Sequence, residues 1–335
     1  MLTFAIIAVH LDALAKPQGS LGRLEQVAAR LAFTQQSLSP QTRPRRIVLF
    51  AGDHGVVNGG VSAWPSAVTT AMMATIARGR ASSSALARAA DCDLRLVDMG
   101  SITPLPQPHP PFIAEQRIAA GTADLAHGPA MTIAQFDAAW AAGAAEARAA
   151  VAQGYQILLA GEMGIGNTTP AACLTMLLTG TDAATATGKG AGADDVMRAH
   201  KQIIIAGAVA REQSRLDSDP KAAIAALCGF EIAAMAGFYA VVAQAGATIL
   251  LDGYVTTAAA LIAERLAPGT ANQMVAAHLS AEPGHRAALD TLGLEPMLEW
   301  EMRLGEGTGA LTALPLLDAA AALLCDVATL AEVIG

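Results

Sequence analysis

The sequence predicts an α/β fold, a Rossmann-like parallel sheet flanked by helices, with a small helical domain built from both termini. Short β-branched or leucine-rich runs recur through the middle of the 335-residue chain, and each gives way to an alanine-rich helical segment. Strands this short and apolar, alternating with helices, are typical of a parallel sheet that is covered on both faces. The two ends of the chain lack clear strands and read as helical.

The predicted strands follow one another in a regular pattern. Four runs each end in a glycine or an acidic residue, and a fifth is weaker; they cover residues 47–51, 94–97, 157–160, 248–251 and 274–279. Open α/β sheets place their ligands at the carboxyl ends of such strands. The acidic residues that we therefore expect at this edge are Asp53, Asp98, Glu162 and Asp252.

The segments outside these strands define the predicted domains. A turn and an amphipathic helix are expected within residues 11–33, a Pro/Arg-rich linker at 40–46, a loop at 104–111 and a helix over 311–330. We predict a large α/β domain at 43–295, which binds nucleotide and base, and a small helical domain formed by 1–42 with 296–335.

Composition excludes several classes of protein. A net charge of −8 without a dense Lys/Arg block argues against a nucleic-acid or anionic-membrane partner. The four cysteines are far apart and form no CxxC pair, which fits buried thiols in a reducing cytoplasm rather than disulfides or a zinc site. The short apolar run at 3–9 lacks the features of a signal peptide.

Residues 222–251 are apolar enough to resemble a membrane span. Glu231 and Gln244 interrupt the stretch, and glycines punctuate it. We therefore expect a buried helix followed by a strand, and no membrane span.

The motif GEGTGA places Glu306 in a glycine-walled turn ahead of the C-terminal apolar helix. Glycines let backbone and ligand come close, so a glutamate there is either a surface charge or a working acid/base group. We favour the acid/base group.

The motif GEMGIGNTT, at 161–169, follows a strand and opens a helix. Its backbone N–H groups are candidates to bind an anion at the helix N-terminus, although a tight connection with Asn167 or Thr168 as helix cap fits equally well. A phosphate there would gain from a nearby cation, and the candidates are Lys201 and Lys189, which otherwise read as surface lysines.

Two further motifs stay open on the residues alone. In SAEPGH, Ser280 could contact a ribose or phosphate, but Pro-Gly is an ordinary turn and His285 reads as a capping or surface histidine. After GDHG, Trp64 and Met72 could line a flat aromatic ligand, although core packing is the commoner reason for such residues. Asp53 and His54 have no further ligand at metal-binding spacing, so no metal site is predicted.

Taken together and in order, several of these motifs resemble one family. They are FAGDHGVV with GVSAWP, GEMGIGNTT, GFEIAAMAG, LLDGYVTTAAA, SAEPGH and RLGEGTGA. They are similar to those of the nicotinate-nucleotide–dimethylbenzimidazole phosphoribosyltransferases, over nearly the whole chain. The N-terminal motif departs at Gln18, where a second proline is common, and Trp64 stands where other members often carry another aromatic residue.

The resemblance implies a cytoplasmic homodimer that needs no cofactor and works in cobalamin biosynthesis. It would move the phosphoribosyl group of nicotinate mononucleotide to 5,6-dimethylbenzimidazole with inversion at C1', giving α-ribazole 5'-phosphate and nicotinate. The implied catalytic base is Glu306. The implied nucleotide site is Glu162, Gly164, Ile165, Gly166, Asn167, Lys201 and Ser280, and the implied benzimidazole wall is Ser62, Trp64, Met72 and Leu304.

Two other functions are compatible with a Rossmann-like sheet. A nucleotide-dependent oxidoreductase would need a dinucleotide fingerprint after the first strand, and GDHGVV is not one. A non-catalytic nucleotide-binding protein would bind nicotinate mononucleotide without releasing nicotinate to an acceptor base.

Overall fold

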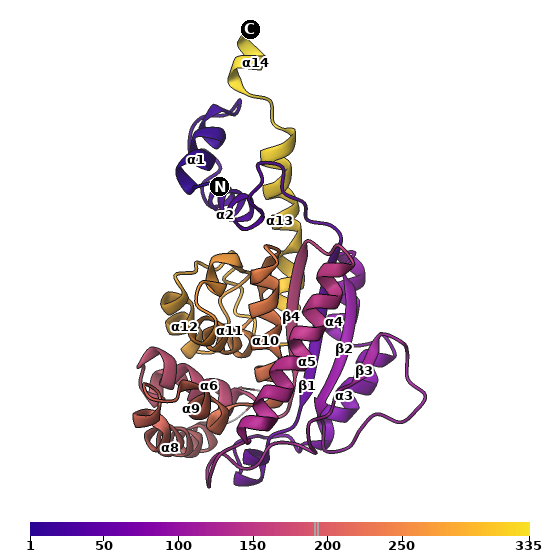
Figure 1. Cartoon of the computed structure of the whole chain (residues 1–335), viewed down its shortest axis with the longest axis vertical. Helices are drawn as coiled ribbons and strands as arrows, with labels where there is room; N and C mark the ends of the chain where they lie inside the picture. Colours follow the sequence, from indigo (N-terminus) through magenta and orange to yellow (C-terminus); the bar gives the residue numbers. More distant parts are fainter. Residues whose placement is uncertain (191, 193) are drawn as a thin grey trace.

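The computed structural model describes residues 1–190, 192 and 194–335, and it confirms the α/β fold (Figure 1). Six parallel strands form one sheet in the order β3-β2-β1-β4-β5-β6, which is the classic Rossmann order. The strands are β1 (Arg45–Gly52), β2 (Asp93–Gly100), β3 (Ile113–Glu115), β4 (Ile157–Met163), β5 (Thr248–Leu251) and β6 (Met274–Ala276).

Four strands lie where the sequence predicts them, and the fifth is shorter than expected. β6 ends at Ala276, and the chain beyond it continues as loop with an isolated bridge at His278. The edge strand β3 was not predicted, because its three residues follow Pro110 and Pro111 and carry no readable alternation. The order of the strands reverses between β1 and β4, so the crevice for a ligand is expected at their carboxyl ends.

Helices connect the strands and cover the sheet. The α-helices are α1 (Phe4–Ala13), α2 (Arg23–Gln35), α3 (Ala67–Ala77), α4 (Ser82–Ala89), α5 (Ile133–Ala152), α6 (Thr168–Thr179), α7 (Ala183–Ala186), α8 (Asp195–Glu212), α9 (Pro220–Leu227), α10 (Phe230–Gln244), α11 (Tyr254–Leu266), α12 (Gly284–Leu292), α13 (Thr308–Asp326) and α14 (Leu330–Ile334). Three short 3-10 turns are η1 (Gly55–Gly59), η2 (Gln213–Arg215) and η3 (Thr270–Gln273).

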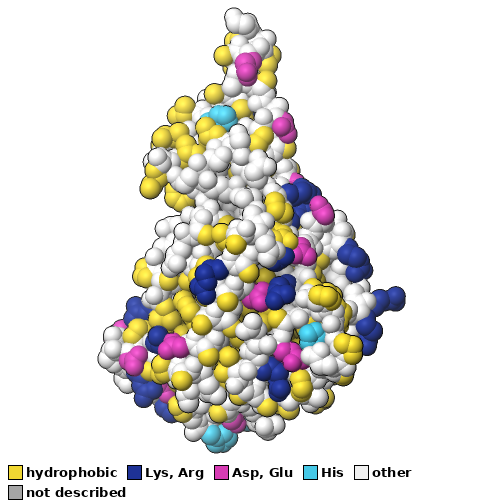
Figure 2. Space-filling model, turned by 45° about the vertical axis from the view of Figure 1, so that its right-hand side comes forward, with side chains coloured by type: hydrophobic (Ala, Val, Ile, Leu, Met, Phe, Trp, Pro, Cys, Tyr) yellow, Lys and Arg dark blue, Asp and Glu magenta, His cyan; other side chains and the backbone are white. Residues whose placement is uncertain are grey.

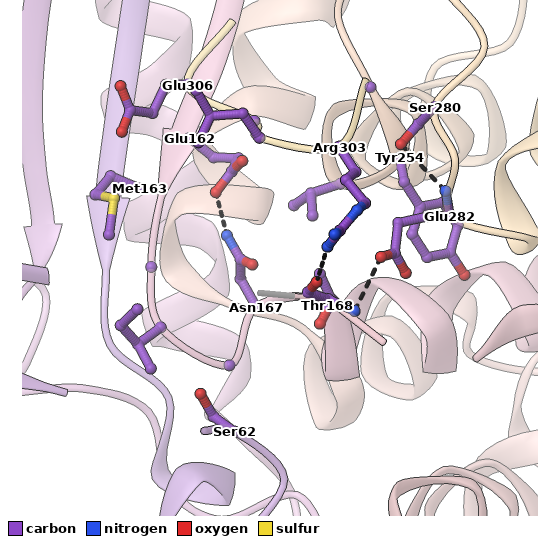
Figure 3. Close-up of a pocket in the computed structure, with 18 of the residues that line it drawn as sticks. Ser62, Glu162, Met163, Asn167, Thr168, Tyr254, Ser280, Glu282, Arg303 and Glu306 are labelled. Atoms are coloured by element: carbon purple, nitrogen blue, oxygen red, sulfur yellow. Dashed lines mark hydrogen bonds between the residues drawn. The ribbon is translucent and has the colours of Figure 1, made fainter. Parts of the chain in front are cut away.

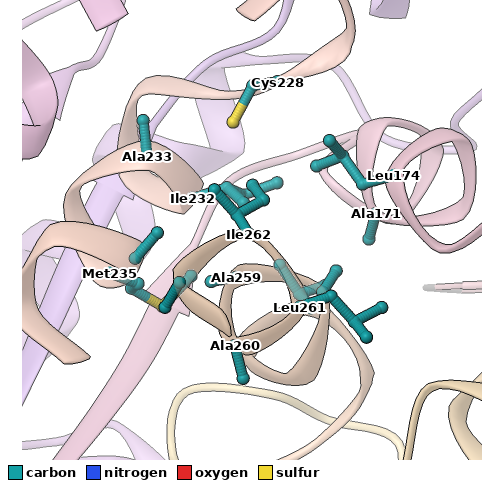
Figure 4. Packing of buried hydrophobic residues seen from close by; sticks show 14 of the residues in the cluster. Ala171, Leu174, Cys228, Ile232, Ala233, Met235, Ala259, Ala260, Leu261 and Ile262 are labelled. Carbon is teal, nitrogen blue, oxygen red and sulfur yellow. The ribbon is translucent and has the colours of Figure 1, made fainter. Parts of the chain in front are cut away.

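Buried apolar side chains form a core on each face of the sheet. One cluster joins the strands to α5, α6, α10 and α11, as the packing around Ile232 and Ile262 shows (Figure 4). α5 and α10 approach closely at glycines: a Cβ on Gly143 would lie 1.8 Å from the carbonyl oxygen of Ala234. The second cluster lies on the opposite face and includes α3, α4 and the first half of α13.

The apolar stretch 222–251 corrects one expectation. It holds two helices and a strand rather than one helix and a strand, because the chain turns extended at Cys228 and Gly229 between α9 and α10. A Cβ on Gly229 would lie 2.4 Å from the His54 ring, so this sharp break needs a glycine. Each of the three elements is too short to cross a bilayer.

The two ends of the chain pack together. α1, α2 and the later part of α13 share a small apolar cluster that includes Ile7, Ala32 and Leu324. Together with α14 they project from the body of the molecule (Figure 1). α13 is the one described helix long and apolar enough to cross a membrane, but its residues belong to these cores. α13 packs both on the sheet and with α1 and α2, so it belongs to both predicted domains. The predicted domain boundaries therefore stay a prediction.

The cysteines differ from expectation at one position. Cys92, Cys173 and Cys228 are buried free thiols, whereas Cys325 is exposed near the end of α13.

Candidate active site

A cavity of about 390 Å³ opens at the carboxyl ends of β4 and β5 (Figure 3). Six segments build it: the segment after η1, the β4–α6 turn, the α7–α8 loop, the β5–α11 turn, the β6–α12 turn and the loop before α13. All twelve site residues predicted from the sequence line it. They are Ser62, Trp64, Met72, Glu162, Gly164, Ile165, Gly166, Asn167, Lys201, Ser280, Leu304 and Glu306.

Glu306 lies in the cavity wall with its carboxylate held by a hydroxyl. Ser83 on α4 donates a hydrogen bond from Oγ to Glu306 Oε2 at 2.9 Å, and both side chains are buried. The backbone of Glu306 has φ of 56°, in the left-handed region between Gly305 and Gly307, which are also left-handed. A non-glycine residue in this conformation costs free energy that the surrounding structure must offset.

The turn that carries Glu306 is anchored from below by Asp252, at the end of β5. Asp252 accepts hydrogen bonds from the N–H groups of Gly307, at 3.1 Å, and Ala310, at 2.9 Å, at the N-terminus of α13. Burial raises the pKa of Asp252, while the nearby His278 and these backbone N–H groups oppose the shift.

Glu162, near the carboxyl end of β4, lies against the turn that carries Glu306. A Cβ on Gly305 would be 2.1 Å from Glu162 Oε1, so this contact requires glycine. Asn167 donates a hydrogen bond from its side chain to Glu162 and therefore does not cap α6. Burial raises the pKa of Glu162 to about 8, and the charges of Asp252 and Glu306 add to the rise, although the Asn167 hydrogen bond lowers it.

The β4–α6 turn offers fewer free N–H groups than its sequence suggests. Ile165 donates its N–H to Thr69 Oγ1 at 3.1 Å, and Asn167 donates its N–H to the carbonyl of Gly164 at 3.2 Å. Gly166 has φ of 88°, and a Cβ on it would lie 2.5 Å from Val57. Its glycines thus serve close packing, and anion binding by this turn stays a prediction.

The two candidate lysines lie in different environments. Lys201 on α8 is 2% exposed and donates from Nζ to Thr168 Oγ1 at 2.6 Å, on the first turn of α6. Burial lowers the pKa of Lys201 to about 8, and the charge of Glu282 opposes that shift. Lys189 is half-exposed and pairs with Asp195 at 3.0 Å. Its loop includes Ala191, which lies outside the described residues. Of the two lysines, Lys201 is therefore the better candidate for a buried cation next to the β4–α6 turn.

Ser280 is fixed by a buried histidine, which corrects the expectation for His285. His285 is 0% exposed; its Nδ1 accepts the N–H of Ser280 at 2.8 Å, and its Nε2 lies 2.9 Å from Thr257 Oγ1. Because Nδ1 accepts, Nε2 carries the proton. Burial lowers the pKa of His285 to about 3, so the ring is neutral and acts as a brace for the β6–α12 turn.

The opposite wall of the cavity is apolar. Trp64 is 52% exposed and Leu304 is 59% exposed. Trp64 is therefore not a core residue, although core packing is the commoner reason for a tryptophan in such a position. Met72 is partly buried against the second core cluster. A half-open wall of this kind suits a flat apolar ligand.

Two of the four strand-end acids lie outside the cavity. Asp53 accepts from Thr69 Oγ1 at 2.6 Å and so holds the residue that binds Ile165. Asp98 accepts the N–H groups of Gly100 and Ser101 at the end of β2. His54 lies 2.9 Å from Glu231 in a buried pair, and the described residues contain no group of three potential metal ligands.

Sequence reasoning missed two charged residues of the cavity, Glu282 and Arg303, and it did not foresee that Asp252 would hold the turn of Glu306. Arg303 lies three residues before Glu306 and donates from Nη1 to the carbonyl of Gly190 at 3.1 Å. Glu282, inside SAEPGH, accepts the N–H of Gly190 at 2.9 Å. Both contacts reach backbone of a loop distant in sequence, and a motif carries no signal for that.

Comparisons with known proteins agree with the geometry. A family model described as phosphoribosyltransferase matches residues 4–333. The nicotinate-nucleotide–dimethylbenzimidazole phosphoribosyltransferase of Ectopseudomonas mendocina is 46% identical over 95% of this chain and 90% of its own length. The protein of that name from Thermus thermophilus is 43% identical over 96% of this chain and 95% of its own length. A crystal structure from Thermus thermophilus superposes with a TM-score of 0.92 over 98% of both chains.

Proposed function

The chain belongs to the nicotinate-nucleotide–dimethylbenzimidazole phosphoribosyltransferase family, and on that premise we propose how its cavity performs the transfer. It moves the phosphoribosyl group of nicotinate mononucleotide to 5,6-dimethylbenzimidazole, giving α-ribazole 5'-phosphate and nicotinate. The observation that carries the proposal is the charge layout of one cavity. The carboxylates Glu162 and Glu306 lie together on one side of the cavity, and Arg303 lies apart from them, bonded to the same residue, Gly190, as Glu282 (Figure 3). Lys201, another cation of the lining, is bonded to Thr168.

This layout matches the charges of the substrate. Nicotinate mononucleotide carries a cationic pyridinium at C1' and an anionic phosphate at the far end of the ribose. Positive charge grows on the ribosyl ring as the glycosidic bond breaks, and carboxylates placed beforehand stabilise it. The phosphate lies with Lys201, the β4–α6 turn of Gly164, Ile165, Gly166 and Asn167, and Ser280, and Glu162 contacts the ribose.

Glu306 acts as the general base. Nicotinate leaves as a neutral ring nitrogen, so its departure needs no general acid. The free nitrogen of the benzimidazole attacks C1' while the other ring nitrogen gives its proton to Glu306. The new C–N bond forms on the face opposite the departing nicotinate, which inverts C1' from β to α. A positioned base of this kind contributes about 10²–10⁴-fold.

The benzimidazole lies against Ser62, Trp64, Met72 and Leu304. An apolar wall on one side and Glu306 on the other hold the acceptor ring in line with the leaving group, which converts an encounter of two molecules into an oriented step.

The test is nicotinate release from nicotinate mononucleotide with and without 5,6-dimethylbenzimidazole. We expect base-dependent release in the wild type and a fall of about 10²-fold or more in Glu306→Gln. Glu299→Gln, a surface carboxylate paired with Arg286, is the matched control and keeps wild-type rates. Absence of base-dependent release in the wild type contradicts the transferase, and an unimpaired Glu306→Gln variant moves the base elsewhere.

We also propose that the protein is a homodimer in the cytoplasm. Apolar side chains are exposed on α1 and α14, among them Ile6, Val9 and Val333. Hydrophobic side chains are visible on the surface of the projecting part (Figure 2). Surfaces of this kind mark protein contacts. The four cysteines are free thiols, three of them buried, which fits a reducing compartment. Light scattering of the purified chain should give twice the monomer mass, and Val9→Asp should lower it; a monomer in the wild type contradicts the dimer.

A further inference from the structure

Ser83, on α4, makes the one hydrogen bond that the Glu306 side chain has with the described residues. Its hydroxyl donates to Glu306 Oε2 at 2.9 Å. Ser83 is 0% exposed and, unlike Glu306, it does not line the cavity. The hydroxyl therefore reaches the proposed base from the protein side, where no group of a substrate can contact it.

Three serines follow one another at the start of α4, and the middle one contacts Glu306. Ser82 is exposed, and the Ser84 hydroxyl donates to the backbone carbonyl of Ile76 at 3.3 Å. Ser83 is the second residue of α4, so the Glu306 carboxylate lies against the first turn of this helix. The helix dipole favours a negative charge there.

Both partners of this contact belong to well-packed parts of the molecule. Ala87 of α4 and Leu311 of α13 are members of the second core cluster, so α4 is fixed relative to the helix that follows Glu306. Asp252 holds the backbone of the Glu306 turn, whereas Ser83 holds the side chain. Oε1 of Glu306 makes no hydrogen bond with a described residue, and it is therefore the oxygen that is available to take a proton.

We propose that Ser83 is a positioning residue of the transfer reaction, which holds Oε2 of Glu306 and thereby presents Oε1 to the ring N–H of the acceptor base. This inference rests on the proposed function of Glu306 as general base. In the transfer step the N–H bond of the benzimidazole breaks, its electron pair stays on the ring, and the proton goes to Oε1. Misplacing a reacting group by about 1 Å costs roughly 10²-fold in rate, so loss of this one buried hydroxyl slows the chemical step.

The test measures single-turnover nicotinate release at saturating 5,6-dimethylbenzimidazole, together with the affinity for each substrate by calorimetry. We expect Ser83→Ala to lower the single-turnover rate by roughly 10- to 100-fold and to leave both affinities within about twofold of wild type. Ser84→Ala is the matched control, because it removes the neighbouring buried hydroxyl of the same helix, and it keeps the wild-type rate.

A double-mutant cycle separates positioning of the base from a general effect on the fold. In the Glu306→Gln background, Ser83→Ala should change the residual rate by less than about twofold, since residues that act as one unit are not additive. A further fall as large as in the wild-type background would overturn the proposal. An equal loss in Ser84→Ala would overturn it as well, and so would an unchanged or raised rate in Ser83→Ala.

Failure of the proposed reaction and failure of this inference give different results. Absence of acceptor-dependent release in the wild type contradicts the transferase and, with it, the role of Ser83. Normal release in the wild type with an unimpaired Ser83→Ala variant removes the role of Ser83 and leaves the transferase standing.

Discussion

Asp252 accepts a hydrogen bond from the backbone N–H of Gly307, the residue that follows Glu306, at 3.1 Å. Its other oxygen accepts the N–H of Ala310, so one carboxylate holds both the turn and the first residues of α13. These N–H groups have no partner within the helix. A carboxylate at the helix N-terminus also interacts favourably with the helix dipole. The position of the proposed base, Glu306, thus depends on Asp252, which lies directly after β5.

Asp252→Asn should reduce kcat more than it changes KM. An amide keeps one acceptor oxygen, so one of the two N–H groups loses its partner, at a cost of about 1–3 kcal/mol in stability. A loosened turn misplaces Glu306, and we expect a fall in kcat of roughly tenfold or more. Asp98→Asn is the control: it also replaces a buried carboxylate, whose Oδ1 accepts two N–H groups and whose Oδ2 accepts the Ser101 hydroxyl, but it lies outside the cavity. It should lose stability and keep kcat, and equal kcat losses in both variants would refute this role.

Gly305→Ala should impair catalysis beyond its conformational cost. Its φ is 86°, and the new Cβ would lie 2.1 Å from Glu162 Oε1. Gly293 has φ of 65° with nothing within 4 Å of its Cβ position, so Gly293→Ala carries the backbone cost of about 1–2 kcal/mol alone. Thermal unfolding and kcat/KM should both fall further in Gly305→Ala. Indistinguishable variants would mean that Glu162 moves aside freely.

Affinity for nicotinate mononucleotide should fall as the pH rises through about 8. Burial places the pKa of Lys201 near that value, and the neutral amine above it no longer attracts phosphate. Glu162, with a pKa also near 8, becomes anionic over the same range. Lys201→Arg stays charged and should retain affinity to higher pH, which separates the two groups. Calorimetric titrations from about pH 6.5 to 9.5 measure this. The same fall in Lys201→Arg would assign it to Glu162.

The same pKa shift of Lys201 acts on stability with a defined sign. The folded-state pKa is lowered, so the unfolded chain binds more protons between about pH 8 and the ordinary value of 10.5. The free energy of unfolding should therefore gain from this residue as the pH rises across that window, the reverse of its effect on binding. Chemical denaturation of wild type and Lys201→Met over this range tests it, and the stability of the wild type relative to the variant should rise with pH.

Trp64→Ala should raise KM for 5,6-dimethylbenzimidazole by roughly tenfold and leave KM for the nucleotide unchanged. The side chain is 52% exposed, so its removal costs the fold little while taking away a stacking surface. Trp300 is 63% exposed and does not line the cavity, which makes Trp300→Ala the control. Initial rates with each substrate varied in turn measure both constants. An unchanged benzimidazole KM would place the acceptor on another wall.

The sheet could be predicted from the sequence because buried parallel strands are nearly continuous apolar runs. β1, β2, β4 and β5 carry that signal, and the acids that follow them mark the binding edge. β3 lacks it, since three residues at an edge need no such run. The break at Gly229 was also missed, because its cause is the His54 ring, a contact between distant parts of the chain.

The cavity lining was predictable to the extent that motifs contain it. Glu306 and Glu162 are flanked by glycines whose spacing signals close approach. Arg303 and Glu282 were missed because each binds backbone of Gly190, at separations of 113 and 92 residues. His285 was expected near the surface. It is buried because its helix, α12, packs against α11, which carries its partner Thr257, and its neighbours in sequence do not reveal that contact.

The contact between α2 and α13 joins the beginning of the chain to its end. Synthesis proceeds from the N-terminus, so α2 emerges long before the helix that covers it, and its apolar side waits uncovered on the nascent chain. α13 also brings with it the turn of Glu306. The packing of α13 on α2 and the placement of Glu306 in the cavity are therefore one late event. A chain that lacks α13 and its preceding turn is expected to be inert even when its sheet has formed.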